Sequence, residues 1–142
     1  MNGNPAFSAY AISSTILALH LIFLALWTGK VRGQAKTYVS EEDAHAFKGA
    51  KAATEHVDVL RAYRAHMNAL ENDVPFFVVG LLYAMTGATA TGAAAYYYTF
   101  VGARVLHSIF YLGGMQPWRT IAFLVGALAV VGMAVHVLRA SF

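Results

Sequence analysis

The stretch that decides the fold covers residues 61–76 and reads RAYRAHMNALENDVPF. At about 100° per residue of an α-helix, its polar side chains fall within an arc of roughly 100°; they are Arg61, Arg64, Asn68, Glu71 and Asn72. His66 points to the opposite side. The apolar run from Val74 to Met85 follows, and Pro75 removes a backbone hydrogen bond and predicts a kink. The stretch therefore predicts a helix that carries a polar face into apolar surroundings.

The composition around this helix indicates a membrane protein. Of 142 residues, 58% are hydrophobic and 12% are charged, whereas soluble domains have about 45–50% apolar and about 25% charged residues. Disorder, a coiled coil and a nucleic-acid-binding arm are excluded. A net charge of +3 gives no dense basic patch despite a pI near 9.3, so we expect no nucleic-acid partner. The chain has no cysteine, so it has no disulfide, thiolate metal site or cysteine nucleophile, and we expect no metal.

Most charged residues lie between Lys30 and Arg64, which leaves long apolar stretches on either side. A bilayer core about 30 Å thick needs about 20 helical residues. We therefore predict an all-α protein, a single domain over residues 1–142 that forms an integral membrane four-helix bundle. Its helices are expected at about 7–28, 61–86, 93–113 and 117–139, with a loop over 30–60. Val74 to Met85 is too short to cross alone, so the second helix must include the polar stretch.

The charges also predict an orientation. Residues 1–10 contain no basic residue, so the first span is expected to be a retained helix rather than a cleaved signal peptide. The positive-inside rule places the 30–60 loop and Arg119 in the cytoplasm and both termini on the opposite side. In the loop, Ser40 followed by Glu41, Glu42 and Asp43 predicts the start of a short helix. Residues 96–98, all Tyr, predict an interfacial aromatic belt.

The third and fourth spans add further polar residues. Arg104, His107 and Tyr111 share one helix face, and Arg119 lies in the first turn after Pro117. Guanidinium groups bind carboxylates in a bidentate manner, so these arginines favour an anionic ligand. Two structural explanations stay open. Arginines near helix ends also extend to lipid headgroups, and Glu71 can serve as an ion-pair partner of an arginine.

At these residues the chain resembles the membrane-associated proteins in eicosanoid and glutathione metabolism (MAPEG), and within that family the microsomal glutathione transferase type. Residues 64–76 and 80–83 match its signature, 100–104 with His107 and 111–112 its third helix, and 116–117 with Arg119 the start of its fourth. Arg32, Glu42, Asp43 and Phe47 match the region after its first helix.

The resemblance implies a homotrimer with glutathione bound between subunits at the cytoplasmic leaflet. The glutathione-binding residues that it implies are Arg32, Arg64, His66, Asn68, Glu71, Arg104, Tyr111 and Arg119. Glu71 is expected to bind the γ-glutamyl ammonium group, and the arginines the carboxylates. His66 lies off the polar face, which suits contact with a neighbouring subunit. Ala44 stands where the mammalian transferase has a cysteine, so activation by thiol modification is not expected.

The implied activity is conjugation of glutathione to lipophilic electrophiles that arrive from the bilayer. We expect Arg119 or Arg104 to stabilise the thiolate, with Tyr111 as a hydrogen-bond donor, so that these are the catalytic residues. The same thiolate suits a peroxidase that detoxifies lipid hydroperoxides. A bacterial inner membrane or an endomembrane is the expected location.

Three other functions remain as alternatives. An eicosanoid-type synthase or isomerase of the same family would use glutathione on one specific lipid. A haem-binding membrane anchor would use two of His20, His66, His107 and His136, although histidines in bundles are more often structural. A cation-coupled transporter would use Glu71 as a proton carrier, which the nearby arginines disfavour.

Overall fold

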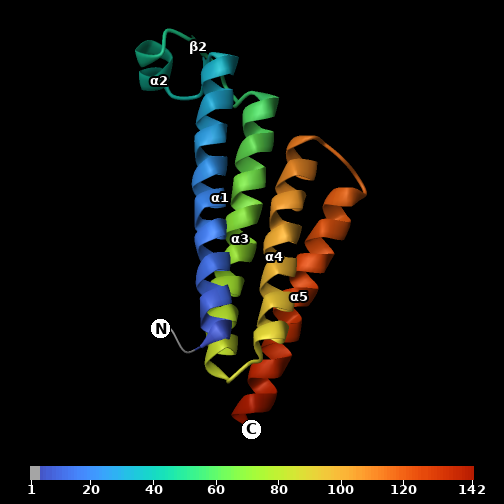
Figure 1. Cartoon of the computed structure of the whole chain (residues 1–142). Helices are drawn as coiled ribbons and strands as arrows, with labels where there is room; N and C mark the ends of the chain where they lie inside the picture. Colours follow the sequence, from blue (N-terminus) through green and yellow to red (C-terminus); the bar gives the residue numbers. More distant parts are fainter. Residues whose placement is uncertain (1–3) are drawn as a thin grey trace.

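The computed structural model describes residues 4–142, and it is all-α, as the sequence predicts, with 81% helix. Four helices are long: α1 Pro5–Ala35, α3 Val57–Met85, α4 Ala90–Leu112 and α5 Trp118–Ser141. The fifth, α2 Glu41–Ala46, lies in the loop between α1 and α3. Figure 1 shows the long helices side by side, with the α2 loop at one end and both termini at the other.

All four long helices differ somewhat from the sequence-based bounds, and α1 and α3 differ most. Helix α1 begins earlier than residue 7, because Asn4 caps it by accepting a hydrogen bond from the Phe7 amide at 3.2 Å and Pro5 fits its first turn. It continues past Trp27 to its last residue, Ala35. The next residue, Lys36, has a left-handed φ of 50° and caps the helix. Helix α3 begins at Val57 and is not interrupted at Pro75; it continues to Met85. The helical hydrogen-bond pattern therefore extends beyond the purely apolar stretches.

The short helix in the loop is confirmed. The Ser40 hydroxyl caps α2 by accepting a hydrogen bond from the Asp43 amide at 3.2 Å. Two short strands, β1 Thr37–Tyr38 and β2 Ala50–Lys51, were not predicted; they pair in parallel on either side of α2. A Cβ at Gly49 would lie 2.6 Å from the Lys36 carbonyl oxygen. The two strands can therefore pair in this way only with glycine at that position.

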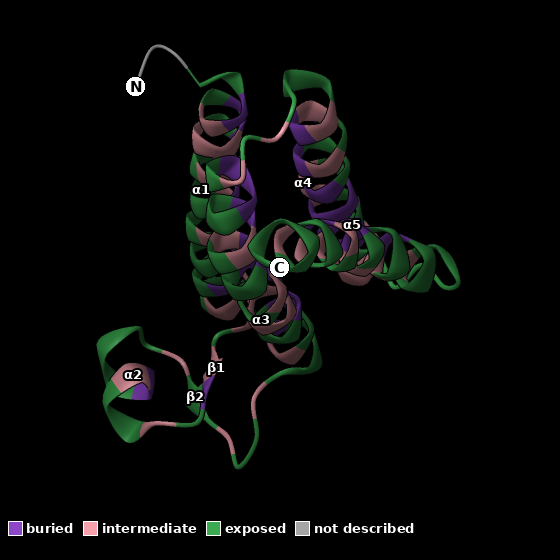
Figure 2. Ribbon diagram, turned by 90° about the horizontal axis from the view of Figure 1, so that it is seen from below, coloured by how far each residue is buried: buried purple, intermediate pink, exposed green. Residues whose placement is uncertain are grey.

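The long helices pack mainly in two pairs, α1 with α3 and α4 with α5, and α4 also contacts α1 and α3. Buried residues lie on the helix sides that face one another (Figure 2), while large apolar side chains point outward. Leu26 on α1 is 69% exposed and Leu128 on α5 is 68% exposed. Helices α1 and α5 are long and apolar enough to cross a membrane, which agrees with this outward apolar surface.

The aromatic core lies in the half of the molecule near the termini. Phe76 of α3 stacks on Phe100 of α4, with ring centroids 4.5 Å apart. Tyr97 is fully buried against Phe76, and its hydroxyl donates to the Gly80 carbonyl at 2.8 Å. The interpretation of residues 96–98 as an interfacial belt is therefore wrong for Tyr97, and only Tyr98 of the three is exposed. A tyrosine buried with its hydroxyl satisfied is a stable core residue.

Candidate functional site

The arginines singled out in the sequence lie toward the end of the molecule that carries the α2 loop. The start of α3, the end of α4 and the start of α5 all lie toward that end (Figure 1). The Arg61 guanidinium lies 4.0 Å from the position that a Cβ on Gly114, in the α4–α5 turn, would occupy. The antiparallel course of the helices therefore places cationic residues that are far apart in the sequence toward the same end of the molecule.

Tyr111 and Arg119 form a contact across the α4–α5 turn. Helix α4 ends at Leu112, and Gly114, with a φ of 67°, reverses the chain before α5 begins at Trp118. The Arg119 guanidinium then lies over the Tyr111 ring, 4.5 Å from its centroid. Arg119 is half-buried, and Tyr111 also contacts the ring of buried His107 at 5.7 Å. This contact holds a cation and a phenol hydroxyl close together.

The outer face of α3 carries Arg64 and Glu71, which are both exposed. They lie two turns apart, and Asn68, half-buried, lies between them. Among residues 4–142, neither Arg64 nor Glu71 has an ion-pair partner within 4.0 Å. The explanation that Glu71 neutralises an arginine of the same subunit therefore finds no contact in its favour, and both charges are free to meet a ligand or a second chain.

Arg104 lies in the interior, with only 1% of its surface exposed. Its Nη2 donates to the Asn68 side-chain oxygen at 2.8 Å and to the Asn68 carbonyl at 3.0 Å. Its Nε lies 3.7 Å from a carboxylate oxygen of Asp73, which is fully buried. The guanidinium therefore faces α3 rather than the open surface.

Asp73 is the residue that the sequence analysis missed. It lies on the inward row of α3 with Ala62, Ala65, Ala69 and Phe76, all buried. The spacing of these small and apolar residues, three or four apart, was the available signal. A carboxylate on such a row is stabilised by a cation that faces it, and Arg104 is the charged residue within the third span.

The remaining predicted site residues lie elsewhere. Arg32, in the last turn of α1, pairs with Glu55 of the loop at 2.9 Å. It also lines a small cavity of about 220 Å³ together with Gly29, Gly33, Tyr38, Asp43 and Phe47. His66 is half-buried on α3. Within one chain the predicted residues thus form separate groups: Arg104 with Asn68, Tyr111 with Arg119, Arg64 with Glu71, and Arg32 with the loop.

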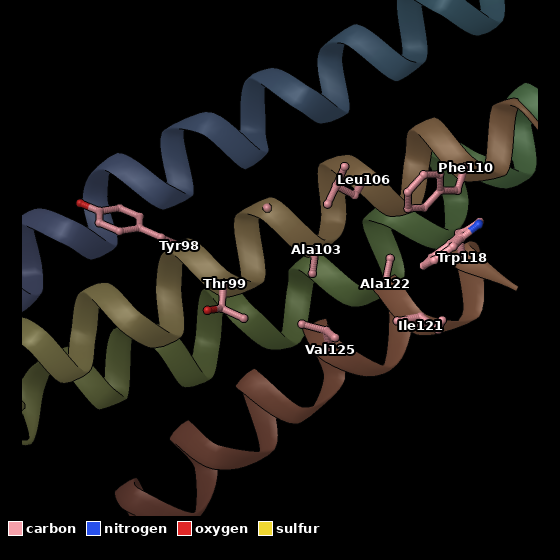
Figure 3. Close-up of a pocket in the computed structure, with 10 residues that line it drawn as sticks. Tyr98, Thr99, Ala103, Leu106, Phe110, Trp118, Ile121, Ala122 and Val125 are labelled. Atoms are coloured by element: carbon pink, nitrogen blue, oxygen red, sulfur yellow. The ribbon is translucent and has the colours of Figure 1, made fainter. Parts of the chain in front are cut away.

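An apolar groove of about 490 Å³ runs along α4 and α5 on the outside of the molecule. Figure 3 shows side chains from both helices bordering it, from Tyr98 at one end to Trp118, the neighbour of Arg119, at the other. Its lining residues are Tyr98, Thr99, Gly102, Ala103, Leu106, Phe110, Trp118, Ile121, Ala122 and Val125. Such a surface suits a lipophilic molecule.

Two of the four histidines considered for haem binding lie toward opposite ends of the molecule. His136, near the end of α5, contacts the Tyr83 ring edge-on at 4.9 Å, whereas His107 lies beside Tyr111 toward the other end. No group of three or more His, Asp or Glu side chains that suits a metal ion occurs in the described part of the chain. These positions do not support a haem held by His107 and His136 together.

Comparisons of the sequence with a family model and with known proteins indicate the same family. The model of the MAPEG family matches residues 10–139. The chain is 38% identical to mouse microsomal glutathione S-transferase 1, over 94% of this chain and 88% of the relative. It is 36% identical to the pig protein of the same name, over 96% and 91%. It is also 32% identical to human prostaglandin E synthase, over 95% and 90%.

Proposed function

The chain belongs to the MAPEG family, and we propose that it is a membrane-bound glutathione transferase that conjugates glutathione to hydrophobic electrophiles. The observation that carries this proposal is the outer face of α3. There Arg64 and Glu71 are exposed with Asn68 between them, and neither has an ion-pair partner among residues 4–142. Glutathione has two carboxylates and one ammonium group, so a face with both signs of charge complements it.

We propose that this face is covered by a second copy of the chain in a homotrimer. An ionised side chain at membrane depth costs at least about 2.5 kcal/mol unless it pairs or lines a polar cavity. A four-span protomer with Arg64 and Glu71 toward lipid would bear that cost. Glutathione between two subunits removes it, with Arg32 and His66 as further contacts. The site then faces the cytoplasm, and the termini lie on the other side.

In the proposed reaction Arg119 stabilises the glutathione thiolate. A free thiol has a pKa of about 8.5, so most of it is protonated at neutral pH. A guanidinium beside the sulfur lowers that pKa, and the released proton passes to water. Tyr111, in contact with Arg119, donates a hydrogen bond to the sulfur. Arg119 suits this role better than Arg104, because Arg104 is buried against Asn68 and Asp73.

The electrophile is proposed to approach along the apolar groove between α4 and α5. The groove ends at Trp118, next to Arg119, so a lipophilic substrate there lies close to the thiolate. The sulfur attacks the electrophilic carbon, a C–S bond forms, and the leaving group departs with its electron pair. With a lipid hydroperoxide the thiolate attacks the terminal peroxide oxygen instead, the O–O bond breaks, and the lipid alcohol leaves after taking up a proton. The glutathione sulfenic acid formed in this step then reacts with a second glutathione thiol to give glutathione disulfide and water. Peroxidase activity is thus proposed at the same site.

Thiolate formation tests the role of Arg119. Mixing the lipid-reconstituted protein with glutathione at pH 7 should give an ultraviolet difference signal for the thiolate. In Arg119→Ala the signal should fall by about tenfold, equivalent to about 1.4 kcal/mol. Arg139→Ala is the matched control, since Arg139 is an exposed arginine at the other end of the same helix. Equal signals from wild type and Arg119→Ala would remove Arg119 from the chemistry.

A second candidate function is a glutathione-dependent synthase or isomerase acting on one lipid. The similarity to prostaglandin E synthase, nearly as extensive as that to the transferases, favours keeping it. Parallel assays with chloronitrobenzene and with lipid epoxide or endoperoxide substrates separate the two. Turnover of one lipid alone, without conjugation of chloronitrobenzene, would support the synthase.

A further inference from the structure

The interior of the molecule contains a charged pair that the proposed reaction does not use directly. Asp73 of α3 and Arg104 of α4 are 0% and 1% exposed, with Oδ1 and Nε 3.7 Å apart. Among the described residues, Asp73 is the carboxyl group within ion-pair distance of Arg104. A buried guanidinium without a partner is strongly destabilising, so Asp73 is what makes the position of Arg104 tolerable.

The same guanidinium fixes a residue on the proposed ligand face. Arg104 Nη2 donates to both Asn68 oxygens, the side-chain Oδ1 at 2.8 Å and the backbone carbonyl at 3.0 Å. An arginine has no acceptor, so the Asn68 amide must turn its oxygen toward Arg104. Its NH₂ group is then left for another acceptor, and among the described residues it donates to none of the protein's atoms within hydrogen-bond distance.

Asn68 lies at the boundary between this interior pair and the outer face of α3. It is half-buried, while Arg64 and Glu71 on either side along the helix are exposed. A fixed amide that presents N–H groups there is a donor for a carbonyl or carboxylate oxygen of a bound peptide. Holding the amide before the ligand arrives removes part of the ordering cost of binding.

We propose that Asp73 is a positioning residue for glutathione: it orients Arg104, which orients Asn68. This inference rests on the proposed use of glutathione, and it adds a residue that acts through two others without touching the ligand. Loss of the Asp73 carboxylate frees the guanidinium to turn away from Asn68, and the amide loses its fixed orientation. Glutathione binding weakens, while the thiolate chemistry beside Arg119 continues once glutathione is bound.

The test uses the full-length protein in lipid nanodiscs, with glutathione Kd from calorimetry and steady-state kinetics with chloronitrobenzene. Asp73→Asn keeps the size of the side chain and removes its charge. It should raise the Kd and KM for glutathione about tenfold, equivalent to about 1.4 kcal/mol, and change kcat at saturating glutathione less than twofold. If Asp73 acts through Asn68, the Asp73→Asn/Asn68→Ala double variant should bind no more weakly than Asn68→Ala alone.

Met133→Ala controls for a general loss of stability, because Met133 is fully buried in the aromatic core on α5. It should lower Tm without changing the Kd for glutathione. Asp73→Glu carries the same test if Asp73→Asn is not recovered folded, since it moves the carboxyl group without removing its charge, and a raised Kd is again expected.

Measurements on the wild-type protein distinguish a failure of the proposed function from a failure of the positioning role. Wild-type protein that binds no glutathione contradicts the proposed function itself. Wild type that binds glutathione, together with Asp73 variants that have a lower Tm but the wild-type Kd, overturns the positioning role and leaves Asp73 a purely structural residue.

Discussion

At the scale of single residues, two carboxyl groups of α3, those of Glu71 and Asp73, differ in their surroundings although they are two positions apart. Glu71 is exposed on the outer face, and Asp73 is fully buried against Arg104. Successive helical positions differ by about 100°, so residues two apart point to nearly opposite sides. Glu71 is thus available to an incoming ammonium group, whereas Asp73 serves an arginine of its own chain.

Removing the charge of Glu71 should weaken glutathione binding. Glu71→Gln keeps the shape and loses a charge-assisted hydrogen bond worth about 1.5–3 kcal/mol, so the Kd should rise by about 10- to 100-fold. Calorimetry with glutathione measures it. Glu41→Gln is the control, since Glu41 is an exposed glutamate paired with Lys51 in the loop. An unchanged Kd in Glu71→Gln would contradict the assignment of this residue to the ligand.

At the scale of elements, the pairing of α4 with α5 creates the apolar groove beside Arg119. Gly102 contributes to it, because a Cβ added there would meet nothing within 4 Å. The groove exists because small residues, Gly102, Ala103 and Ala122, line it between larger ones. Its shape therefore depends on which helix faces meet.

Filling the groove should weaken the use of the electrophile without weakening the binding of glutathione. Gly102→Leu places an isobutyl group in open space, so it should raise the KM for a bulky electrophile severalfold while the Kd for glutathione stays unchanged. The fold should be retained, because replacing a mid-helix glycine recovers about 0.5–1 kcal/mol of backbone entropy. Steady-state kinetics with electrophiles of increasing size measures the effect, and Gly102→Ala is the small-residue control. An equal rise in the KM for the electrophile and in the Kd for glutathione would argue against the groove as the electrophile's path.

At the scale of the whole molecule, one chain does not bring all the predicted ligand residues together. Arg64 and Glu71 face outward, Arg32 pairs with the loop, and Arg119 lies on Tyr111. A site that uses all of them needs a second subunit against the outer face of α3. The proposed homotrimer supplies one at each of its interfaces.

Native mass spectrometry from detergent should therefore give a mass about three times the 15.3 kDa of the protomer, with glutathione retained. Leu70→Trp, on the exposed side of α3, should shift the trimer toward monomer and lower activity, because a larger side chain opens the interface. Leu128→Trp on the outward face of α5 should leave the trimer intact. Full activity from a monomeric wild type would contradict the assembly.

The order of amino acids alone predicts the all-α class, the approximate places of the long helices, the Ser40 cap and the polar face of α3. These features depend on interactions between residues three or four apart, which periodicity and composition report directly. The arginines and Tyr111 could be named as candidates because arginine in an apolar span is costly and needs a reason.

Which of those residues contact one another depends on how the helices pack. Asp73 and Arg104 are 31 positions apart in the chain, and only the packing of α3 on α4 places their groups 3.7 Å from each other. The same packing buries Tyr97, and the α4–α5 turn sets Arg119 on Tyr111. Helical periodicity states which side of a helix a residue occupies, but the rotation and depth of one helix against another depend on all the side chains between them.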